Sequence, residues 1–521
     1  MNKLLKAFSG TKALLALIFL AGLLVRFLYF PDNIYFGFDQ ARDAYESQSI
    51  YKNFDIKLVG PPTSSPDFFH GPLYWYLVGP IYILGGGDPS VPAGFMRIYN
   101  ALGIFIIFCI AKMLFNSRVG LVASVLYAFS FEQTQYAIYF HHPPLAVLTI
   151  MLFYGGLAAA IFKKNWWGVP ISLLGYGLSV QSEFQLLYLG VIFILLCLIF
   201  RRRLLPLVNT KTLLISALFF LVSVSTFILA EFQFGGRTIQ GMWVMVFQKE
   251  KGGGDWFFAF NTYLKRLVLQ IHDNILGVDG FAPILLFLLL FVALIYILTK
   301  RKESSKILFL AIWFLSTSVL TFFGPISLYY TNVGISPALL LIVSFFVAKI
   351  YEKLRWFAVA IVVLIAISNI NLIKEQNYKG VIGDIQVQEG MLLGREKQAL
   401  DYIYNESEGK PIVVSASTMP LRINTTWAYL FNWYGNLKYG RVPYWAGPTA
   451  QGYPGELPRW TSQEQSYVAF GIIEPVRGVR GAFIEQFKEE QKQYGEYVGE
   501  FRLGDEKSQS QIIVQKSIHS D

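Results

Sequence analysis

The sequence predicts a polytopic α-helical membrane protein with about eleven transmembrane helices and a C-terminal soluble α/β domain. Three observations indicate this fold class. Long apolar stretches recur over residues 1–372, basic clusters alternate with them, and the composition becomes polar over residues 373–521. Of all residues, 54% are hydrophobic and only 15% are charged, whereas about a quarter of the residues of a soluble protein are charged.

The transmembrane domain is expected over residues 1–372. Lys3, Lys6 and Lys12 precede the first apolar segment and no small-residue cleavage pattern follows it, so we interpret it as an uncleaved helix with a cytoplasmic N-terminus. At about 20 residues for each span, the candidate spans are residues 13–30, 93–114, 119–137, 143–162, 167–182, 184–200, 212–230, 281–299, 307–323, 335–350 and 356–372.

Charge predicts the topology of these spans. Because cytoplasmic loops collect Lys and Arg, alternation from a cytoplasmic N-terminus places every short basic cluster inside: Arg118, Lys163–Lys164, Arg201–Arg203, Lys300–Lys302 and Lys349–Arg355. This holds only if residues 71–87, a short stretch interrupted by Pro80, form an interfacial or re-entrant helix. The chain is therefore expected to be a multi-pass plasma-membrane protein, and its net charge of +10 does not indicate a nucleic-acid partner.

Three polar regions would then lie outside the membrane: a first loop with juxtamembrane helices (31–92), a later loop (231–280) and the C-terminal domain (373–521). In that domain "KPIVVSAST" and "SQIIVQKS" predict strands, and "EGMLLGREKQALDYIYN" and "GAFIEQFKEEQKQYGEYVGEF" predict helices. Cys109 and Cys197 both lie in apolar runs, so neither a disulfide framework nor a thiolate metal site is predicted.

The first loop carries the candidate chemistry. Asp39, Arg42, Asp43 and Glu46 follow the first apolar segment at spacings that place all four on one helix face. A solvated helix end explains this spacing about as well as a site does. Further along, His70 meets the aromatic stretch "HGPLYWYL"; a lone histidine is more often structural, but this one is well placed to meet a lipid phosphate.

Several stretches resemble a known family in their order along the chain. They are "FDQARDAYESQSIY", "GPPTS", "HGPLYWYL" and "FMRIYNALGIFIIFCIAKMLFNSRVGLVASVLYAFS". Together they resemble the polytopic GT-C glycosyltransferases, and most closely glycosyltransferase family 39, the group of dolichyl-phosphate-mannose protein mannosyltransferases and aminoarabinose transferases. The resemblance covers about residues 10–200 and continues weakly through residues 328–342.

The resemblance implies an inverting transfer of sugar from a polyprenyl-phosphate donor to a hydroxyl acceptor at the outer membrane face. Asp39 matches the position of the family's catalytic carboxylate, which acts as a general base. Arg42 and Asp43 would orient it or contact sugar and phosphate. His70 and Arg97 match positions where the family has donor-phosphate contacts.

The sequence also departs from the family pattern. His141 and His142 stand where many members have an acidic or amide residue, and Glu132, about ten residues upstream, is a secondary candidate that an interfacial position explains equally well. Because adjacent histidines diverge in a regular element, the pair does not predict a metal site, although a divalent metal stays open as a cofactor. Glu183 replaces a usual histidine and is a candidate for the sugar or acceptor pocket, since acids near the bilayer tend to be functional.

Tyr329 and Tyr330 match an aromatic pair of the family, and Tyr330 is a candidate donor contact, although an interfacial aromatic belt explains the pair as well. Two other functions stay open: a secondary transporter, and a non-catalytic export or assembly factor for lipid-linked sugars. The near absence of Asp and Glu from the spans argues against a transporter, whose pathway would run through ionisable residues inside the membrane. The sugar, the acceptor and the polyprenol length are not determined by the sequence.

Overall fold

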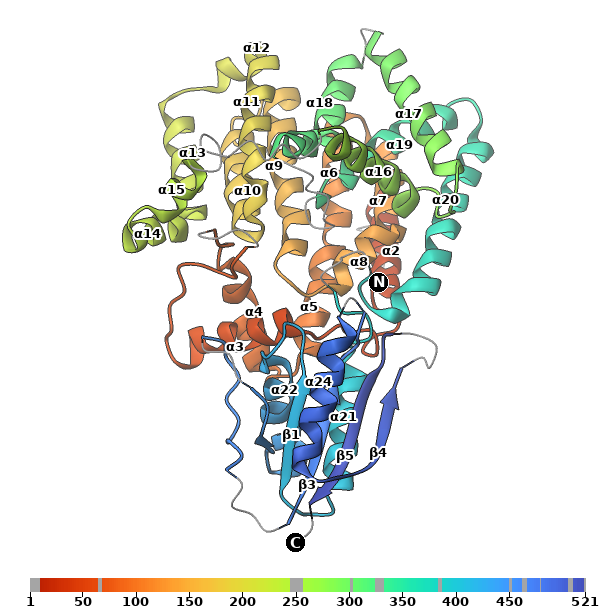
Figure 1. The fold of residues 1–521 in the computed structure, drawn as a ribbon. Helices are drawn as coiled ribbons and strands as arrows, with labels where there is room; N and C mark the ends of the chain where they lie inside the picture. Colours follow the sequence, from red (N-terminus) through yellow and green to blue (C-terminus); the bar gives the residue numbers. More distant parts are fainter. Residues whose placement is uncertain are drawn as a thin grey trace, which may run out of the picture.

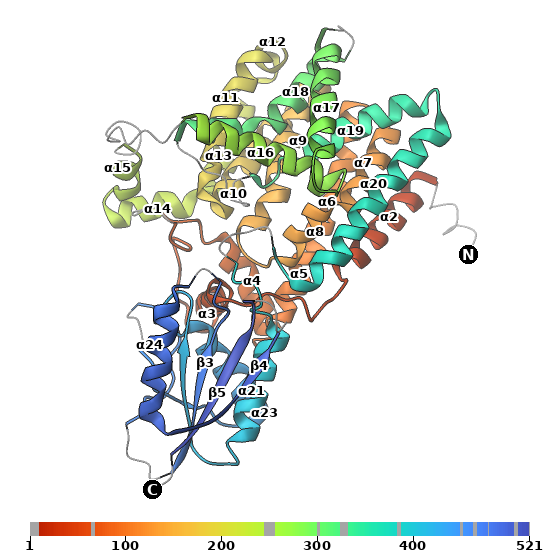
Figure 2. The same cartoon turned by 45° about the vertical axis from the view of Figure 1, so that its right-hand side comes forward.

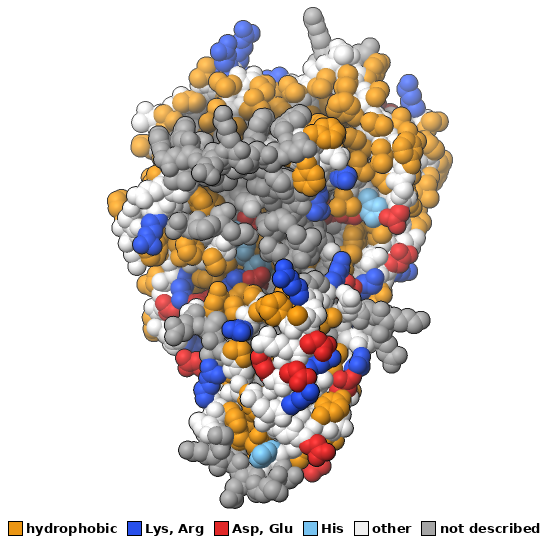
Figure 3. All heavy atoms as spheres, viewed as in Figure 1, with side chains coloured by type: hydrophobic (Ala, Val, Ile, Leu, Met, Phe, Trp, Pro, Cys, Tyr) orange, Lys and Arg blue, Asp and Glu red, His pale blue; other side chains and the backbone are white. Residues whose placement is uncertain are grey.

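The computed structural model describes residues 10–63, 68–243, 256–299, 303–323, 332–382, 387–448, 452–461, 466–477, 479–504 and 509–519. The chain forms three layers: a helical bundle, a thin layer of two short helices, and a small α/β domain (Figures 1 and 2). Apolar side chains dominate the bundle surface in the view of Figure 3, whereas charged side chains are mixed among the others over the α/β domain.

The bundle is built from apolar helices. Its helices are α2 (Gly10–Arg26), α5 (Ser90–Ala101), α6 (Gly103–Leu114), α7 (Ser117–Phe129), α8 (Phe131–Ile138), α9 (Ala146–Lys163), α10 (Gly168–Ser182), α11 (Leu189–Ile199), α12 (Arg201–Leu204), α13 (Thr210–Ser223), α14 (Ser225–Phe234), α15 (Arg237–Trp243), α16 (Trp256–Asn274), α17 (Ala282–Thr299), α18 (Ser304–Phe314), α19 (Ser336–Tyr351) and α20 (Arg355–Gln376). Helices therefore occupy most of each expected span.

Among the described residues, helix length supports fewer complete membrane crossings than the charge pattern predicts. Among the described residues, four helical stretches are long and apolar enough to cross a membrane, and two pairs bent by 81° and 60° bring the number to six. Several expected spans are broken; α7, for example, ends at Phe129 because Ser130 accepts the Gln133 N–H and starts α8. The expectation of eleven crossings stays a prediction.

The middle layer consists of α3 (Phe38–Lys52) and α4 (Leu73–Leu84). With 12 residues α4 is about 18 Å long, too short for a bilayer core of about 30 Å. Figure 1 shows it lying across the end of the bundle, as expected for an interfacial helix. The two helices pack closely at Gly79, which lies against the backbone of Ser47. A side chain at Gly79 would collide with that backbone.

The C-terminal domain contains a five-stranded mixed sheet in the order β2-β1-β3-β5-β4. Its strands are β1 (Ile412–Ser417), β2 (Tyr444–Trp445), β3 (Tyr467–Ile473), β4 (Glu496–Leu503) and β5 (Ile512–His519), and its helices are α21 (Leu393–Glu406), α22 (Thr425–Leu430), α23 (Asn436–Tyr439) and α24 (Gly481–Gln491). β1 pairs parallel with β2 and β3, and β5 pairs antiparallel with β3 and β4. β1 and β3 are buried along almost their whole length, because helices cover both faces of the sheet (Figure 1).

One expected helix is wrong in its second half. The stretch from residue 481 continues as helix only to Gln491, and residues Glu496–Leu503 form the edge strand β4. Gly495 lies between them with a φ of 139°, which ends the helix.

α12, which carries Arg201, lies at the bundle end opposite the α/β domain (Figure 1). This agrees with placing the two on opposite membrane sides, although which side is cytoplasmic stays a prediction.

The α/β domain buries two carboxylic acids close enough to interact. Glu474 accepts hydrogen bonds from the Met419 N–H (2.7 Å) and from Trp427 Nε1 (2.9 Å). The carboxyl group of Glu396 has no hydrogen-bond partner among the described residues. Burial raises the pKa of Glu474 to about 7, and burial together with the charge of Glu474 raises the pKa of Glu396 well above its ordinary value.

We predict that Glu396→Gln stabilises the protein at alkaline pH. The folded state keeps protons on these acids that the unfolded chain loses above about pH 4.3, so the free energy of unfolding falls as the pH rises from about 4.5 past 7. Thermal unfolding in detergent should show a gain of about 1–3 kcal/mol at pH 8 and little at pH 5. Glu485→Gln, on the exposed face of α24, is the control. An equal change at both pH values would contradict the prediction.

Candidate functional site

The candidate site begins at the N-terminal end of α3. The helix starts after Gly37, whose N–H donates to Gln40 Oε1 (3.2 Å). Asp39 lies in the first turn, where the helix dipole stabilises a negative charge. The helical register brings Asp39, Arg42 and Asp43 onto one face, so the spacing in the sequence becomes a contact in the structure.

Arg42 joins two carboxylates. Its Nη1 donates to Asp39 Oδ1 at 2.7 Å, while its Nη2 and Nε donate to Asp43 Oδ1 at 2.9 and 3.2 Å. The guanidinium also lies over the Phe38 ring. The two carboxylates differ in environment, because the side chain of Asp39 is 34% exposed and that of Asp43 is 1% exposed. Among the described residues, the only side chain bonded to the Asp39 carboxylate is Arg42.

Asp43 is the best-coordinated group of the site. Besides Arg42, Trp75 Nε1 of α4 donates to its Oδ1 at 2.8 Å, and His141 Nδ1 lies 2.9 Å from its Oδ2. Burial alone would raise the pKa of Asp43, but Arg42, His141 and Trp75 outweigh burial and lower it to about 2. Asp43 is therefore ionised at physiological pH and holds α3, α4 and the loop after α8 together.

Three histidines continue the cluster away from α3. The rings of His141 and His142 are 4.0 Å apart, and those of His142 and His70 are 4.2 Å apart. His142 Nδ1 donates to the Ser182 carbonyl at the end of α10 (2.7 Å), so its Nε2 carries a lone pair. Burial, reinforced by His141 and Arg42, lowers the pKa of His70 to about 3. Burial likewise lowers the pKa of His142 well below its usual value.

The hydrogen bonds of His70 determine what it can offer to a ligand. Its Nδ1 accepts the Phe184 N–H at 3.2 Å, which leaves the proton of the neutral ring on Nε2. The backbone at His70 is held by two long-range hydrogen bonds, from the Gly60 N–H to the His70 carbonyl and from the Gly71 N–H to the Gln181 carbonyl. A side chain at Gly71 would collide with Gln181. His70 is thus a fixed neutral N–H donor.

His70, His142 and Glu183 form a buried group whose possible ligand atoms lie within 4.8 Å of one another. Glu183 Oε1 is 3.5 Å from His70 Nδ1. Two imidazoles and a carboxylate suit a divalent ion such as Zn²⁺. However, the Phe184 N–H occupies the Nδ1 lone pair of His70 and leaves Nε2 protonated, so this hydrogen-bond pattern favours a donor role for His70 over metal ligation.

The remaining candidates lie outside this cluster. Arg97 is 0% exposed and donates to the Arg26 and Ala93 carbonyls and to Asn33 Oδ1, so it stabilises helix packing, and its expected contact with the donor phosphate stays a prediction. Glu132 accepts from Gln270 Nε2 (2.7 Å) and Asn274 Nδ2 (3.1 Å), and thereby joins α8 to α16. Tyr330 lies outside the described residues.

Sequence reasoning missed Trp75. The stretch "YWYL" reads as interfacial because aromatic residues collect at the membrane surface. In the structure Trp75 is 5% exposed and points inward to Asp43. A buried indole N–H needs an acceptor, but no sequence signal says that Asp43 supplies it.

We predict that Asp43→Asn destabilises the fold more than Asp39→Asn does. The first substitution removes a buried charge that satisfies Arg42 and His141, at a cost of about 3–5 kcal/mol. The second weakens a pair whose carboxylate is 34% exposed and leaves Arg42 bonded to Asp43, at a cost of about 1 kcal/mol or less. Thermal unfolding of the two purified variants in the same detergent checks the order. Equal losses of melting temperature would show that Asp43 is not the structural centre of the cluster.

Known proteins resemble this chain in sequence over one segment and in fold over most of its length. Residues 70–229 match the family model described as dolichyl-phosphate-mannose-protein mannosyltransferase. None of the curated proteins matches the sequence significantly. Two solved structures of GT-C glycosyltransferases share the fold.

ArnT from Cupriavidus metallidurans bound to undecaprenyl phosphate is similar over 97% of this chain and 98% of its own, with a TM-score of 0.56 and 12% identity. The oligosaccharyltransferase AglB from Archaeoglobus fulgidus, in complex with an inhibitory peptide and a dolichol-phosphate, is similar over 83% of this chain, with a TM-score of 0.50 and 14% identity. The chain spans only 64% of the length of AglB. The chain therefore has the fold of the GT-C glycosyltransferases and, over residues 70–229, resembles the dolichyl-phosphate-mannose protein mannosyltransferases, as its sequence predicted.

Proposed function

We propose that this chain is an inverting glycosyltransferase that moves a sugar from a polyprenyl-phosphate donor to a hydroxyl group of a protein, lipid or glycan at the outer face of the plasma membrane. The observation that carries the proposal is the half-exposed Asp39, fixed by Arg42 at the junction between an apolar bundle and a polar domain. Relatives of the same fold bind dolichol-phosphate or undecaprenyl phosphate.

Asp39 has the properties of the general base. Arg42 holds one of its carboxylate oxygens, Oδ1, and the other can receive the proton of an acceptor hydroxyl. As that proton moves to Asp39, the acceptor oxygen forms a bond to the anomeric carbon of the sugar. The bond from that carbon to the phosphate oxygen breaks, and the electron pair leaves with the polyprenyl phosphate. Attack opposite the leaving group inverts the anomeric carbon.

The phosphate would be received by N–H donors of the same cluster, Arg42 next to Asp39 and His70 beyond His142. The Arg42 guanidinium is the cation closest to the base, and a cation here stabilises the charge that grows on the leaving phosphate. His70 would donate its Nε2–H to a phosphate oxygen as a neutral group, since its pKa lies near 3. Glu183, next to His70, is placed to contact a sugar hydroxyl. The hydrocarbon chain of the donor would stay in the bilayer beside the bundle.

The proposed topology follows from the same arrangement. The N-terminus would be cytoplasmic and the C-terminal domain outside, with the reaction at the layer of α3 and α4 between them. A transporter is disfavoured because the ionisable cluster lies at the end of the bundle and not along a path through it.

We predict that Asp39→Asn abolishes transfer while the protein folds and inserts normally. Loss of a general base should lower kcat about 10²- to 10⁴-fold. The measurement is release of polyprenyl phosphate from hexose- and pentose-loaded donors, with mass spectrometry of modified products in cells. Asp32→Asn, an exposed carboxylate a few residues upstream, serves as the control and should transfer normally. Near wild-type transfer by Asp39→Asn would refute the catalytic assignment.

We also predict that His70→Ala raises the KM for the polyprenyl-phosphate donor about tenfold, because one hydrogen bond to a charged phosphate is lost. His70→Gln, whose amide can still donate, should recover part of this affinity. The increase in donor KM of His70→Ala should be the same at pH 6 and pH 8 in steady-state kinetics, since a neutral His70 does not titrate in this range. His272→Gln on α16 is the matched control. An unchanged donor KM in His70→Ala would remove His70 from the donor site.

A further inference from the structure

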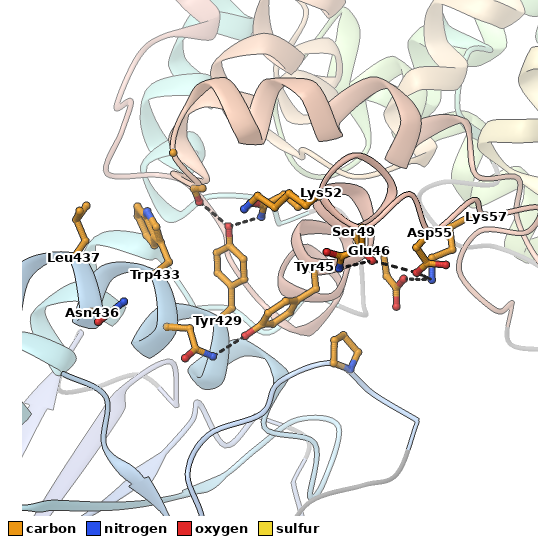
Figure 4. Close-up of a pocket in the computed structure, with 16 residues that line it drawn as sticks. Tyr45, Glu46, Ser49, Lys52, Asp55, Lys57, Tyr429, Trp433, Asn436 and Leu437 are labelled. Atoms are coloured by element: carbon orange, nitrogen blue, oxygen red, sulfur yellow. Dashed lines mark hydrogen bonds and ion pairs between the residues drawn. The ribbon is translucent and has the colours of Figure 1, made fainter. Parts of the chain in front are cut away.

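A cavity of about 600 Å³ lies between α3 and the C-terminal domain (Figure 4). Its volume is within the range of about 300–1,000 Å³ that is typical of small-molecule sites, which often form at domain interfaces. The residues that define it are Tyr45 and Lys52 of α3, and Tyr429, Asn432, Trp433 and Asn436 of the domain. No part of the proposed transfer reaction uses this cavity.

Hydrogen bonds join the two walls of the cavity and fix their relative position. Asn432 Nδ2 donates to the Tyr45 hydroxyl (3.2 Å), and Gln48 Nε2 donates to the Tyr429 hydroxyl (3.1 Å). The Tyr429 hydroxyl donates to the Gly87 carbonyl (2.6 Å), which closes the third side. These contacts fix the aromatic side chains before any ligand arrives, and pre-organised side chains lower the entropy cost of binding.

A π-helical turn sets the domain wall of the cavity. Residues Phe431–Gly435 form this turn between α22 and α23, and it carries Asn432 and Trp433, with Asn436 directly after it. Such turns are rare and occur frequently at functional sites. In Figure 4 Trp433 and Asn436 lie on this wall, on the opposite side of Tyr429 from Tyr45 and Ser49 of α3.

The lining is aromatic and polar, and its two lysines, Lys52 and Lys57, are matched in number by two carboxylates, Glu46 and Asp55. Lys57 pairs with both Glu46 and Asp55 at 2.7 and 2.6 Å, and Lys52 donates to Gln48 Oε1 at 2.8 Å. What remains is a set of rings, amides and hydroxyls. A sugar ring has an apolar C–H face that stacks on an aromatic ring and a rim of hydroxyls that amides bind, so this lining matches a neutral saccharide.

α3 connects this cavity to the reaction centre. Tyr45, Gln48 and Lys52 lie on a face of α3 that is turned by about 120° to 180° from the position of Asp39, while the helix itself spans both positions. Glu46 belongs to both, because it shares the face of Asp39 and also lines the cavity. Asp39 and Glu46 are seven residues apart, about 10 Å along the helix. A ligand in the cavity can therefore extend along α3 toward Asp39.

We propose that this cavity binds the saccharide portion of a glycosylated acceptor, so that a hydroxyl of that acceptor reaches Asp39. The role given to this cavity rests on the proposed transferase function. Its test does not, because sugar binding is measured without a donor. Trp433 supplies the stacking surface, and Asn436 and Lys52 supply hydrogen bonds to sugar hydroxyls.

The test is calorimetric titration of the full chain with α-mannotriose and cellotriose. The protein is held in an amphipol without sugar groups, since maltoside detergents present the same chemistry as the ligand. We expect saturable binding of at least one trisaccharide. Trp433→Ala should weaken it about tenfold or more, whereas Trp433→Phe should retain it within about threefold. Tyr497→Ala, an exposed aromatic on β4, should bind as wild type.

Absence of saturable binding of both trisaccharides by the wild type, or equal binding by Trp433→Ala, would overturn the inference. Trp433-dependent binding of a neutral Ser/Thr-rich peptide in place of the sugars would overturn it as well, since it would make the cavity a peptide site. The two proposals fail separately: lost transfer in Asp39→Asn without sugar binding refutes only the cavity assignment. Sugar binding with undiminished transfer in Asp39→Asn refutes only the catalytic one.

Discussion

The site depends on one buried carboxylate, that of Asp43. Its two oxygens receive Arg42 from the same helix, Trp75 from α4 and His141 from the loop after α8. A buried charge is tolerated only when several donors satisfy it together, so these three elements must meet in one arrangement. The layer of α3 and α4 is thereby fixed to the bundle at the point where the reaction is proposed, and Arg42 is oriented toward Asp39 as a consequence.

Two aspartates four residues apart receive different roles from their surroundings. Asp43 is 1% exposed and its pKa is lowered to about 2, so it is a poor proton acceptor and a good structural anchor. Asp39 is 34% exposed and is bonded through one oxygen only, which leaves room for a substrate hydroxyl. Two histidines also receive different roles from their hydrogen bonds. The bond from the Phe184 N–H leaves an N–H on His70 Nε2, and the bond to the Ser182 carbonyl leaves a lone pair on His142 Nε2.

Much of this arrangement could be predicted from the sequence. Helical spacing placed Asp39, Arg42 and Asp43 on one face, apolar runs located the bundle helices, and β-branched runs located β1 and β5. Local patterns could not locate β4, whose exposed side chains follow a helix without a change in polarity, nor Trp75, whose partner is distant in sequence. The structural partners of Arg97 could not be predicted either, because these backbone carbonyls are brought to it by folding and leave no pattern in the sequence.

The polarity of α3 suits the proposed role of this short helix between a lipid-borne donor and an acceptor. Most of its residues are buried, yet they include Gln40, Arg42, Asp43, Ser47 and Gln48, and a helix that is polar on every side needs polar partners on every side. The bundle loops supply them to the face of Asp43, and the α/β domain supplies them to the face of Gln48 through Tyr429. Because one rigid helix carries both faces, the positions of donor and acceptor groups are coupled through its backbone. A transferase that joins a membrane ligand to a soluble one requires this fixed spacing, since the reacting atoms must be held in line.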